Sequence, residues 1–170
     1  MMMSENGNRR RNFLERILAN EVPNHYIDGI TRLMMGEFSW QKDRWSAMLL
    51  SEEYLPDLED DKTVSDIIDY EIKPTAGLYK RIHLRGPRVQ KVVNKGFNNQ
   101  DHIEGHDYGG PYAWQPMVFG NKKLRHIVIF RDTKFPSTSA LFMINALPQP
   151  WKSSNVISID NPIYDILVLD

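Results

Sequence analysis

YAWQPMVFGNKKLRHIVIFRDTKFPSTSALFMINAL, residues 112–147, is the stretch of this sequence that decides its fold. It holds three runs of apolar, β-branched and aromatic residues, at 112–119, 124–130 and 140–147. Runs of this length and composition, separated by turn residues, are typical of β-strands. Gly120 and Asn121 separate the first two runs and predict a tight turn between them. We therefore expect three strands that follow one another closely.

Further β-rich segments lie on both sides of this stretch. Gly86 and Pro87 predict a turn that joins two of them into a hairpin, and the glycine- and asparagine-rich residues 94–111 predict a long loop. About seven short strands with regular turn signals favour a mainly β fold, a β-sandwich or small barrel. The further candidates are the half-buried strand 44–49, the hairpin segments 78–85 and 88–94, and two short strands within 155–170.

The sequence before this β-rich part begins with a basic stretch and a short helical pattern. Residues 1–11 are polar and basic, and they predict an arm. From Asn12, a suitable N-cap, apolar residues recur at helical spacing until Pro23 ends the segment. We expect residues 1–23 to form a basic N-terminal arm with one short amphipathic helix.

A second helix is predicted over residues 24–35, where apolar residues follow the i, i+3, i+4, i+7 pattern. Gly36 supplies its C-terminal stop. The fold class is thus mainly β with one or two N-terminal helices. We expect residues 24–170 to form a single β-rich domain that includes this second helix.

The acidic residues gather in the segment 51–61, which also contains Pro56 and predicts an exposed connection. Adjacent carboxylates such as those of Glu59, Asp60 and Asp61 normally face water, so we prefer that reading to a glycosidase pair. A helical turn capped by Thr63 is expected to follow and to end at Tyr70.

The charge balance and the absence of cysteine exclude several classes of function. The 170 residues hold 21 Lys and Arg against 22 Asp and Glu, which leaves no overall field to hold nucleic acid or an anionic membrane. Without cysteine there is no disulfide, thiolate nucleophile or cysteine zinc site. No apolar run approaches the roughly 20 residues needed to cross a bilayer, and residues 1–11 lack a secretory signal's apolar centre.

Residues 101–107 hold the densest group of candidate metal ligands. His102 and His106 would point the same way on a helix, but Gly105 and the flanking residues argue against a helix, so an exposed polar loop is preferred to a metal site. Neither a nucleophile-elbow motif nor a phosphate-binding glycine motif occurs. We therefore expect no catalytic residues, no cofactor and no enzyme activity, with a small hydrolase as the remaining enzymatic alternative.

Three segments, in this order and spacing, resemble small structural proteins of tailed phages. They are DGITRLMMGEFSWQKDRWSAMLLSEEYLP at 28–56, HIVIFRDTKFPSTSA at 126–140 and VISIDNPIYDILVLD at 156–170. The resemblance spans about residues 28–170, and residues 91–114 and those before 24 have no counterpart in it. The matching positions are Gly36, Glu37, Trp40, Tyr54, Pro56, Asp57, Leu58, Ser65, Asp66, Ile67, Ile129, Phe130, Arg131, Asp132, Thr133, Thr138, Ser139, Ala140, Leu141, Ile159, Asp160, Ile166, Leu167 and Leu169.

This resemblance implies assembly and no catalysis, because the group has no known catalytic residues to carry over. It implies a virion protein made in the host bacterial cytoplasm, with a capsid cement or decoration role preferred. A neck, tail or baseplate component, including a receptor-binding tip, is the alternative. The implied partners are the major capsid protein or head–tail and tail proteins, together with further copies of the chain in a homo-oligomer, for example a trimer.

The residues expected at protein interfaces come from the basic arm and from aromatic side chains in turn-rich sequence, which we expect to be partly exposed. Arginine and aromatic residues dominate interface energetics, and an anionic protein groove suits the triple arginine better than DNA does. The expected interface residues are Arg9, Arg10, Arg11, Phe13, Leu14, Ile17, Tyr108, Tyr112, Trp114 and Trp151.

Overall fold

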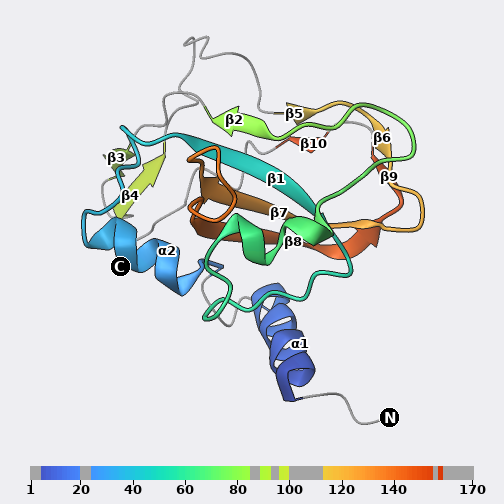
Figure 1. The fold of residues 1–170 in the computed structure, drawn as a ribbon, viewed down its shortest axis with the longest axis horizontal. Helices are drawn as coiled ribbons and strands as arrows, with labels where there is room; N and C mark the ends of the chain where they lie inside the picture. Colours follow the sequence, from blue (N-terminus) through green and yellow to red (C-terminus); the bar gives the residue numbers. More distant parts are fainter. Residues whose placement is uncertain are drawn as a thin grey trace.

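A four-stranded antiparallel sheet forms the centre of the protein in a computed structural model, which describes residues 5–19, 24–84, 89–92, 96–99, 113–154 and 157–158 (Figure 1). The strand order is β2-β1-β7-β8, so neighbours in the sheet come from distant parts of the chain. The predicted mainly β class with N-terminal helices is confirmed. The strands are β1 (Trp45–Ser51), β2 (Ile82–Leu84), β7 (Leu124–Arg131) and β8 (Leu141–Trp151).

Three two-stranded pairs accompany the central sheet. Because β5 and β6 precede β7 whereas β9 and β10 follow β8, two of these pairs join the segments on either side of the β7–β8 hairpin. The pairs are β3 (Val89–Val92) with β4 (Gly96–Asn99), β5 (Ala113–Trp114) with β10 (Ile157–Ser158), and β6 (Met117–Val118) with β9 (Ser153–Ser154).

One predicted pairing is wrong, and one predicted turn is confirmed although its flanking strands do not pair with each other. Segments 78–85 and 88–94 do not form a hairpin with each other, because β2 pairs with β1 and β3 pairs with β4, a strand inside the predicted long loop. The predicted turn at Gly120 exists, and its φ of 65° suits a glycine. However, the strands on its two sides take other partners, since β6 pairs with β9 and β7 pairs with β1 and β8.

Apolar side chains cover both faces of the central sheet. The strand predicted at 44–49 is confirmed as β1, but all seven residues of β1 are buried, so the prediction that it is half-buried is wrong. Trp45, Ala47 and Leu49 enter one core cluster, which β5, β6 and the helix α2 (Ile27–Met34) help to close. Met48 and Leu50 enter the other cluster, which includes residues of the helix α1 (Glu5–Leu18) and of the segment 54–67.

The two helices follow the predicted order but differ from it in their bounds. The helix α1 begins at Glu5, seven residues before the expected N-cap Asn12, so most of the predicted arm is helical. The helix α2 lies inside the predicted range, and Gly36 follows it with a φ of 79°. A methyl group at Gly29 would lie 1.9 Å from the Leu141 carbonyl oxygen, which shows how closely α2 approaches the start of β8.

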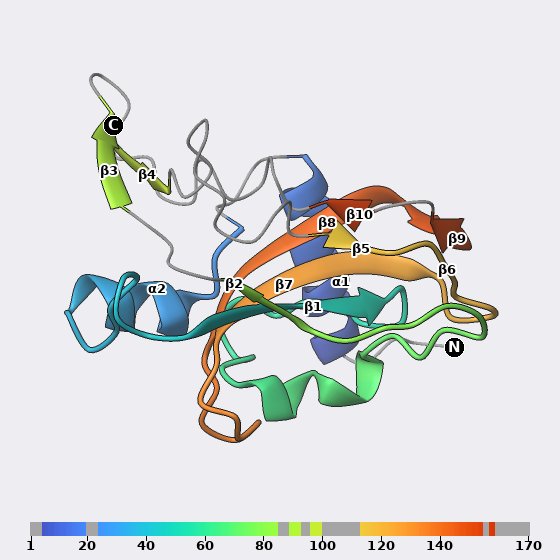
Figure 2. The same ribbon diagram turned by 90° about the horizontal axis from the view of Figure 1, so that it is seen from above.

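The predicted helical turn after Thr63 is confirmed as two 3₁₀ turns, η1 (Val64–Asp66) and η2 (Ile68–Tyr70). The loop between β7 and β8 lies beside η1 (Figure 2), where the Ser65 N–H donates to the Pro136 carbonyl oxygen at 3.1 Å. None of the helices in the described part of the chain has the length and apolar character needed to cross a membrane.

Candidate interaction site

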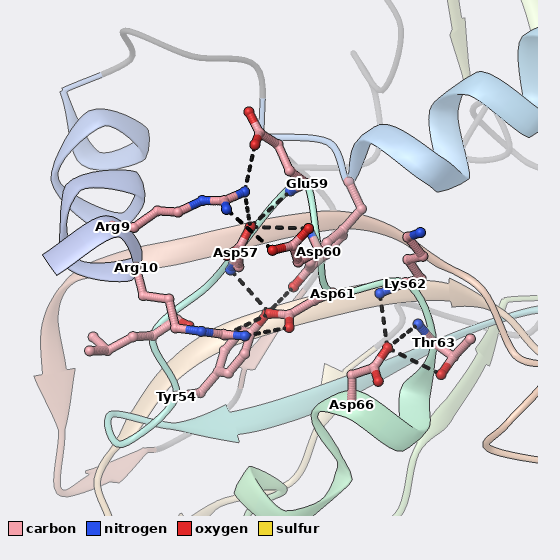
Figure 3. A network of polar contacts seen from close by, with 12 residues as sticks. Arg9, Arg10, Tyr54, Asp57, Glu59, Asp60, Asp61, Lys62, Thr63 and Asp66 are labelled. Atoms are coloured by element: carbon pink, nitrogen blue, oxygen red, sulfur yellow. Dashed lines mark hydrogen bonds and ion pairs between the residues drawn. The ribbon is translucent and has the colours of Figure 1, made fainter. Parts of the chain in front are cut away.

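The most elaborate polar site joins α1 to the segment 54–61, which we call the acidic turn (Figure 3). The turn begins three residues after Ser51, the last residue of β1. It closes on itself through the Asp61 N–H, which donates to the Asp57 carbonyl oxygen at 3.0 Å. The Asp57 carboxylate Oδ1 accepts the N–H groups of Glu59 and Asp60, each at 3.1 Å. Asp57 therefore shapes the turn by capping its own following residues.

Arg10 and Asp61 form the central ion pair of this site. The two guanidinium nitrogens of Arg10 lie 2.9 and 2.8 Å from the two Asp61 oxygens, and Nη1 also donates to the Leu55 carbonyl oxygen at 2.8 Å. The Asp61 side chain is 4% exposed and that of Arg10 28% exposed. The hydrogen bond to Asp61 raises the pKa of Arg10. This bidentate geometry is the strong form of the arginine–carboxylate pair.

A chain of two buried tyrosines continues from Asp61 into the core. Tyr54 donates its hydroxyl hydrogen to Asp61 at 2.7 Å, and the Tyr26 and Tyr54 hydroxyl oxygens are 2.9 Å apart. Because the single hydroxyl hydrogen of Tyr54 is used on Asp61, Tyr26 must be the donor to Tyr54. Burial raises the pKa of both tyrosines, so both hydroxyls stay protonated.

Arg9 makes the outer part of the contact. One of its nitrogens lies 2.5 Å from Glu59 and 3.3 Å from Asp57, and the other lies 3.2 Å from Asp60. Asp57 is fully buried, whereas the side chains of Arg9, Glu59 and Asp60 are at least 40% exposed. Exposed pairs contribute little to stability, so the Arg9 contacts are weaker than the Arg10 pair.

Apolar residues of α1 complete the contact with the body. Ile17 is buried and belongs to the core cluster that also holds Tyr54, and Phe13 packs against the same cluster. Leu14 is partly buried, and Arg11 is exposed. The predicted interface residues of the arm therefore divide into a body-facing set and the exposed Arg11.

The prediction that the acidic segment is an exposed, water-facing connection is wrong for its central residues. Asp57 is fully buried and Asp61 is 3% exposed, although Glu59 and Asp60 do face solvent. The cause is the pairing with Arg9 and Arg10, which lie 48 and 51 residues earlier in the chain. Local charge density cannot reveal a partner so far away in the sequence.

His126 connects the acidic turn to β7, a role that no sequence pattern indicates. Its Nε2–H donates to the Tyr54 carbonyl oxygen at 3.0 Å, and its ring meets the Tyr54 ring edge-on with 5.5 Å between centroids. Since a carbonyl oxygen can only accept, Nδ1 is unprotonated, and it has no hydrogen-bond partner among the described residues. Burial lowers the pKa of His126 to about 3.

The predicted aromatic anchors have different environments. Trp114 is buried, with its indole N–H donating to the Lys80 carbonyl oxygen at 2.8 Å, so the expectation that it is partly exposed is wrong. Trp151 is 39% exposed, as expected. Tyr108, Tyr112 and the candidate metal ligands His102 and His106 lie outside the described residues.

Several exposed apolar side chains were not singled out from the sequence, and three of them lie outside the N-terminal helices in strands and loops. Leu78 is 90% exposed, Phe135 68% and Val118 44%. Val118 pairs with Ser153 on one side and with Ala76 on the other. Leu78 follows Ala76 by two residues, and Trp151 precedes β9 by two residues. We call these three exposed residues near the β6–β9 pair the β6 face.

Phe135 lies at the tip of a strongly bonded loop. The Ser139 hydroxyl donates to the Phe135 carbonyl oxygen at 2.9 Å and accepts the Thr133 N–H at 3.1 Å. Lys134 has a φ of 72°, which is unfavourable for a side chain with a Cβ atom, and its N–H donates to Asp132 at 2.8 Å. These bonds hold Phe135 outward in one backbone conformation.

The chemistry available at these sites is charge pairing and apolar contact. Within the described ranges, no group of three or more His, Cys, Asp or Glu side chains is arranged to hold a metal ion. Comparisons of the chain with protein-family models, with curated proteins and with solved structures found no match. Function must therefore be argued from the residues themselves.

Proposed function

We propose that this chain is a non-enzymatic structural protein of a tailed-phage virion that binds neighbouring virion subunits as a capsid cement or decoration protein. The order and spacing of the three resembling segments support the phage assignment. The observation that carries the binding role is the set of large apolar side chains presented by a hydrogen-bonded body. Such side chains are the usual anchors of protein interfaces.

The β6 face is the first of two surfaces that support this role. Val118 and Trp151 are exposed there on backbone that is paired with neighbouring strands, and Leu78 is exposed two residues after Ala76, which is bridged to Val118. An apolar residue on a fixed backbone loses little conformational freedom when it binds, so more of the contact free energy appears as affinity. This surface suits a partner with an apolar pocket, such as the major capsid protein or a head–tail protein.

The Phe135 loop is the second surface. It projects on the side of the sheet that also carries the 3₁₀ turns (Figure 2), and it is fixed by the Ser139 and Asp132 side chains. A pre-ordered aromatic residue at a loop tip inserts into a pocket without an ordering cost. Two surfaces on different parts of one small body allow each copy to link two neighbours.

Counting copies in purified particles of the encoding phage tests the proposal directly. Quantitative mass spectrometry should find the chain at a copy number comparable with that of the major capsid protein if it is a cement protein. A handful of copies per particle would instead indicate the neck, tail or baseplate. Absence from washed particles, with the chain abundant in the infected cell, would contradict the structural role.

A further inference from the structure

We infer that the acidic turn is a receptor for the helix α1 of a second copy of this chain, so that neighbouring copies exchange their N-terminal helices. The inference rests on the proposed function, because a virion brings many copies of the chain close together, and it names a second copy as one of the neighbours. The occupant is defined by the contacts that α1 makes with its own body. Each copy would offer one helix and one receptor.

The receptor needs a cationic occupant. Asp57 is fully buried and Asp61 nearly so, and Arg10 supplies both of the guanidinium nitrogens that meet Asp61. When α1 leaves the turn, Asp61 loses its bidentate, charge-assisted hydrogen bonds, and only weaker contacts with water can replace them. The body is therefore most stable when some copy of α1 occupies the turn.

The contacts that hold α1 are compact enough to move as a unit. The ion pairs come from the consecutive residues Arg9 and Arg10, and the deepest apolar contact comes from Ile17 two turns later on the same helix. A single helix that carries the whole contact set can make the same contacts with its own body or with a neighbour. This equivalence is the physical basis of domain swapping.

The sequence between α1 and the body favours exchange. Only residues 20–23 separate the last described residue after α1 from the body, and Pro23 is the last of them. Short connections that contain proline are among those that favour the exchange of elements between copies. The closed form seen here keeps the advantage in dilute solution, where no second receptor is near.

A second copy fits the receptor better than other occupants do. The turn offers two buried carboxylates, the Leu55 carbonyl oxygen and an apolar surface near Ile17. A ligand must present two neighbouring cations and an aliphatic side chain two turns away on one helix face. The chain's own α1 presents that set, whereas a nucleic acid would be repelled by the acidic turn.

Mixing two full-length variants tests the exchange. Arg9→Glu/Arg10→Glu leaves the acidic turn intact but disables the helix, and Asp57→Asn/Asp61→Asn leaves the helix intact but disables the turn with near-isosteric amides. In the mixture, the intact helix of the second variant can dock only on the intact turn of the first. Native mass spectrometry with one variant labelled with ¹⁵N should show a one-to-one heterodimer with a Kd at least about tenfold lower than that of either variant alone.

Arg11→Glu is the matched control, because it makes the same charge reversal on the exposed side of α1. Mixed with Asp57→Asn/Asp61→Asn, it should give no such heterodimer, since its own helix still fills its own receptor. Cooperative thermal unfolding of each variant must be checked first. A mixture of folded variants that stays monomeric overturns the inference, whatever the particle measurement shows about the proposed function.

A second readout covers variants that fail to fold. The chain has no cysteine, so Asn8→Cys on α1 and Glu53→Cys beside the acidic turn give unique sites for a donor and an acceptor dye. Exchange predicts energy transfer between differently labelled copies that grows with protein concentration. Arg10→Gln should abolish this signal; transfer that is unchanged by Arg10→Gln, or no transfer at any concentration, overturns the inference.

Discussion

The Arg10 guanidinium binds the Asp61 carboxylate through two nitrogen–oxygen contacts of 2.9 and 2.8 Å, although the residues lie 51 positions apart. Removing the cation leaves a nearly buried carboxylate that keeps only neutral donors. We therefore expect Arg10→Ala to lower the free energy of unfolding by roughly 2–3 kcal/mol. Chemical denaturation measures this loss. Arg11→Ala, an exposed neighbour, should change it by less than about 0.5 kcal/mol, and equal losses in the two variants would count against the pairing.

The two buried tyrosines should behave unequally. Tyr54→Phe removes the donor to Asp61 and the acceptor of the Tyr26 hydroxyl, so it should cost about 1–3 kcal/mol. Tyr26→Phe leaves Tyr54 bonded to Asp61 and should cost about 1 kcal/mol or less. In the double variant no orphaned Tyr26 hydroxyl remains, so its loss should be smaller than the sum of the two single losses. A strictly additive double-mutant cycle would contradict the bonded chain.

The free energy of unfolding should decrease as the pH is lowered, because His126 is buried in its neutral form. Burial lowers its folded-state pKa to about 3 from an ordinary value of 6.5, so the unfolded state binds the extra proton between these values. The contribution of His126 to the free energy of unfolding is complete above about pH 6.5 and is lost as the pH falls toward 3. At pH 5 the loss should be about 2 kcal/mol relative to pH 8.

Denaturation curves of His126→Gln, measured beside those of the unaltered chain, test this effect. His126→Gln should flatten the stability profile between pH 6.5 and 4. Hydrogen bonds from Thr63 and Lys62 outweigh burial and lower the pKa of Asp66 below 3.8, so its contribution is lost only at more acidic pH. An unchanged slope in His126→Gln would refute the assignment.

Two glycines around α2 should respond differently to alanine. At Gly29 a Cβ atom would lie 1.9 Å from the Leu141 carbonyl oxygen, and backbone cannot move aside cheaply, so Gly29→Ala should cost about 3 kcal/mol or more. At Gly36 a Cβ atom meets nothing within 4 Å, and only the φ of 79° opposes it, which should cost about 1 kcal/mol. Thermal unfolding compares the two, and similar losses would show that α2 is not tightly packed on β8.

Local sequence patterns predicted the kinds of elements better than their partners. The helix at 27–34, the 3₁₀ turns after Thr63 and the long strands at 124–131 and 141–151 follow from periodicity, capping and β-propensity. Pairing was different: Gly120 forms the expected turn, yet β6 pairs with β9, which follows β8 in the chain. A turn signal fixes the local backbone and does not choose between nearby strand edges.

Of the two halves of the candidate site, only the α1 half was predicted to make protein contacts. Arg9, Arg10 and Ile17 were predicted to contact a neighbouring protein, because arginine and aliphatic residues share one stretch of sequence, whereas in the structure they contact the chain's own body. Their receptor was misread, because a cluster of carboxylates normally faces water and only a distant arginine makes its burial possible. The extension of α1 back to Glu5 has the same cause, since residues 5–11 gain their contacts from the acidic turn and not from their own periodicity.

Binding to particles should depend on one of the two exposed apolar surfaces more than on the other. The Phe135 loop and the β6 face lie in different parts of the molecule (Figure 2), so they cannot fill the same pocket of one neighbour. Phe135→Ala and Leu78→Ala remove side chains that are 68% and 90% exposed, and each should change the unfolding free energy by less than about 0.5 kcal/mol.

Attachment is measured by incubating each variant with particles that lack the chain. Loss of an anchor residue costs about 2 kcal/mol of binding free energy, which weakens attachment roughly thirtyfold. The variant whose attachment weakens by this factor identifies the surface that faces the capsid. Ser65→Ala, exposed beside the Phe135 loop, is the control for nonspecific effects. If neither variant weakens attachment, the exposed apolar surfaces do not hold the chain on the particle.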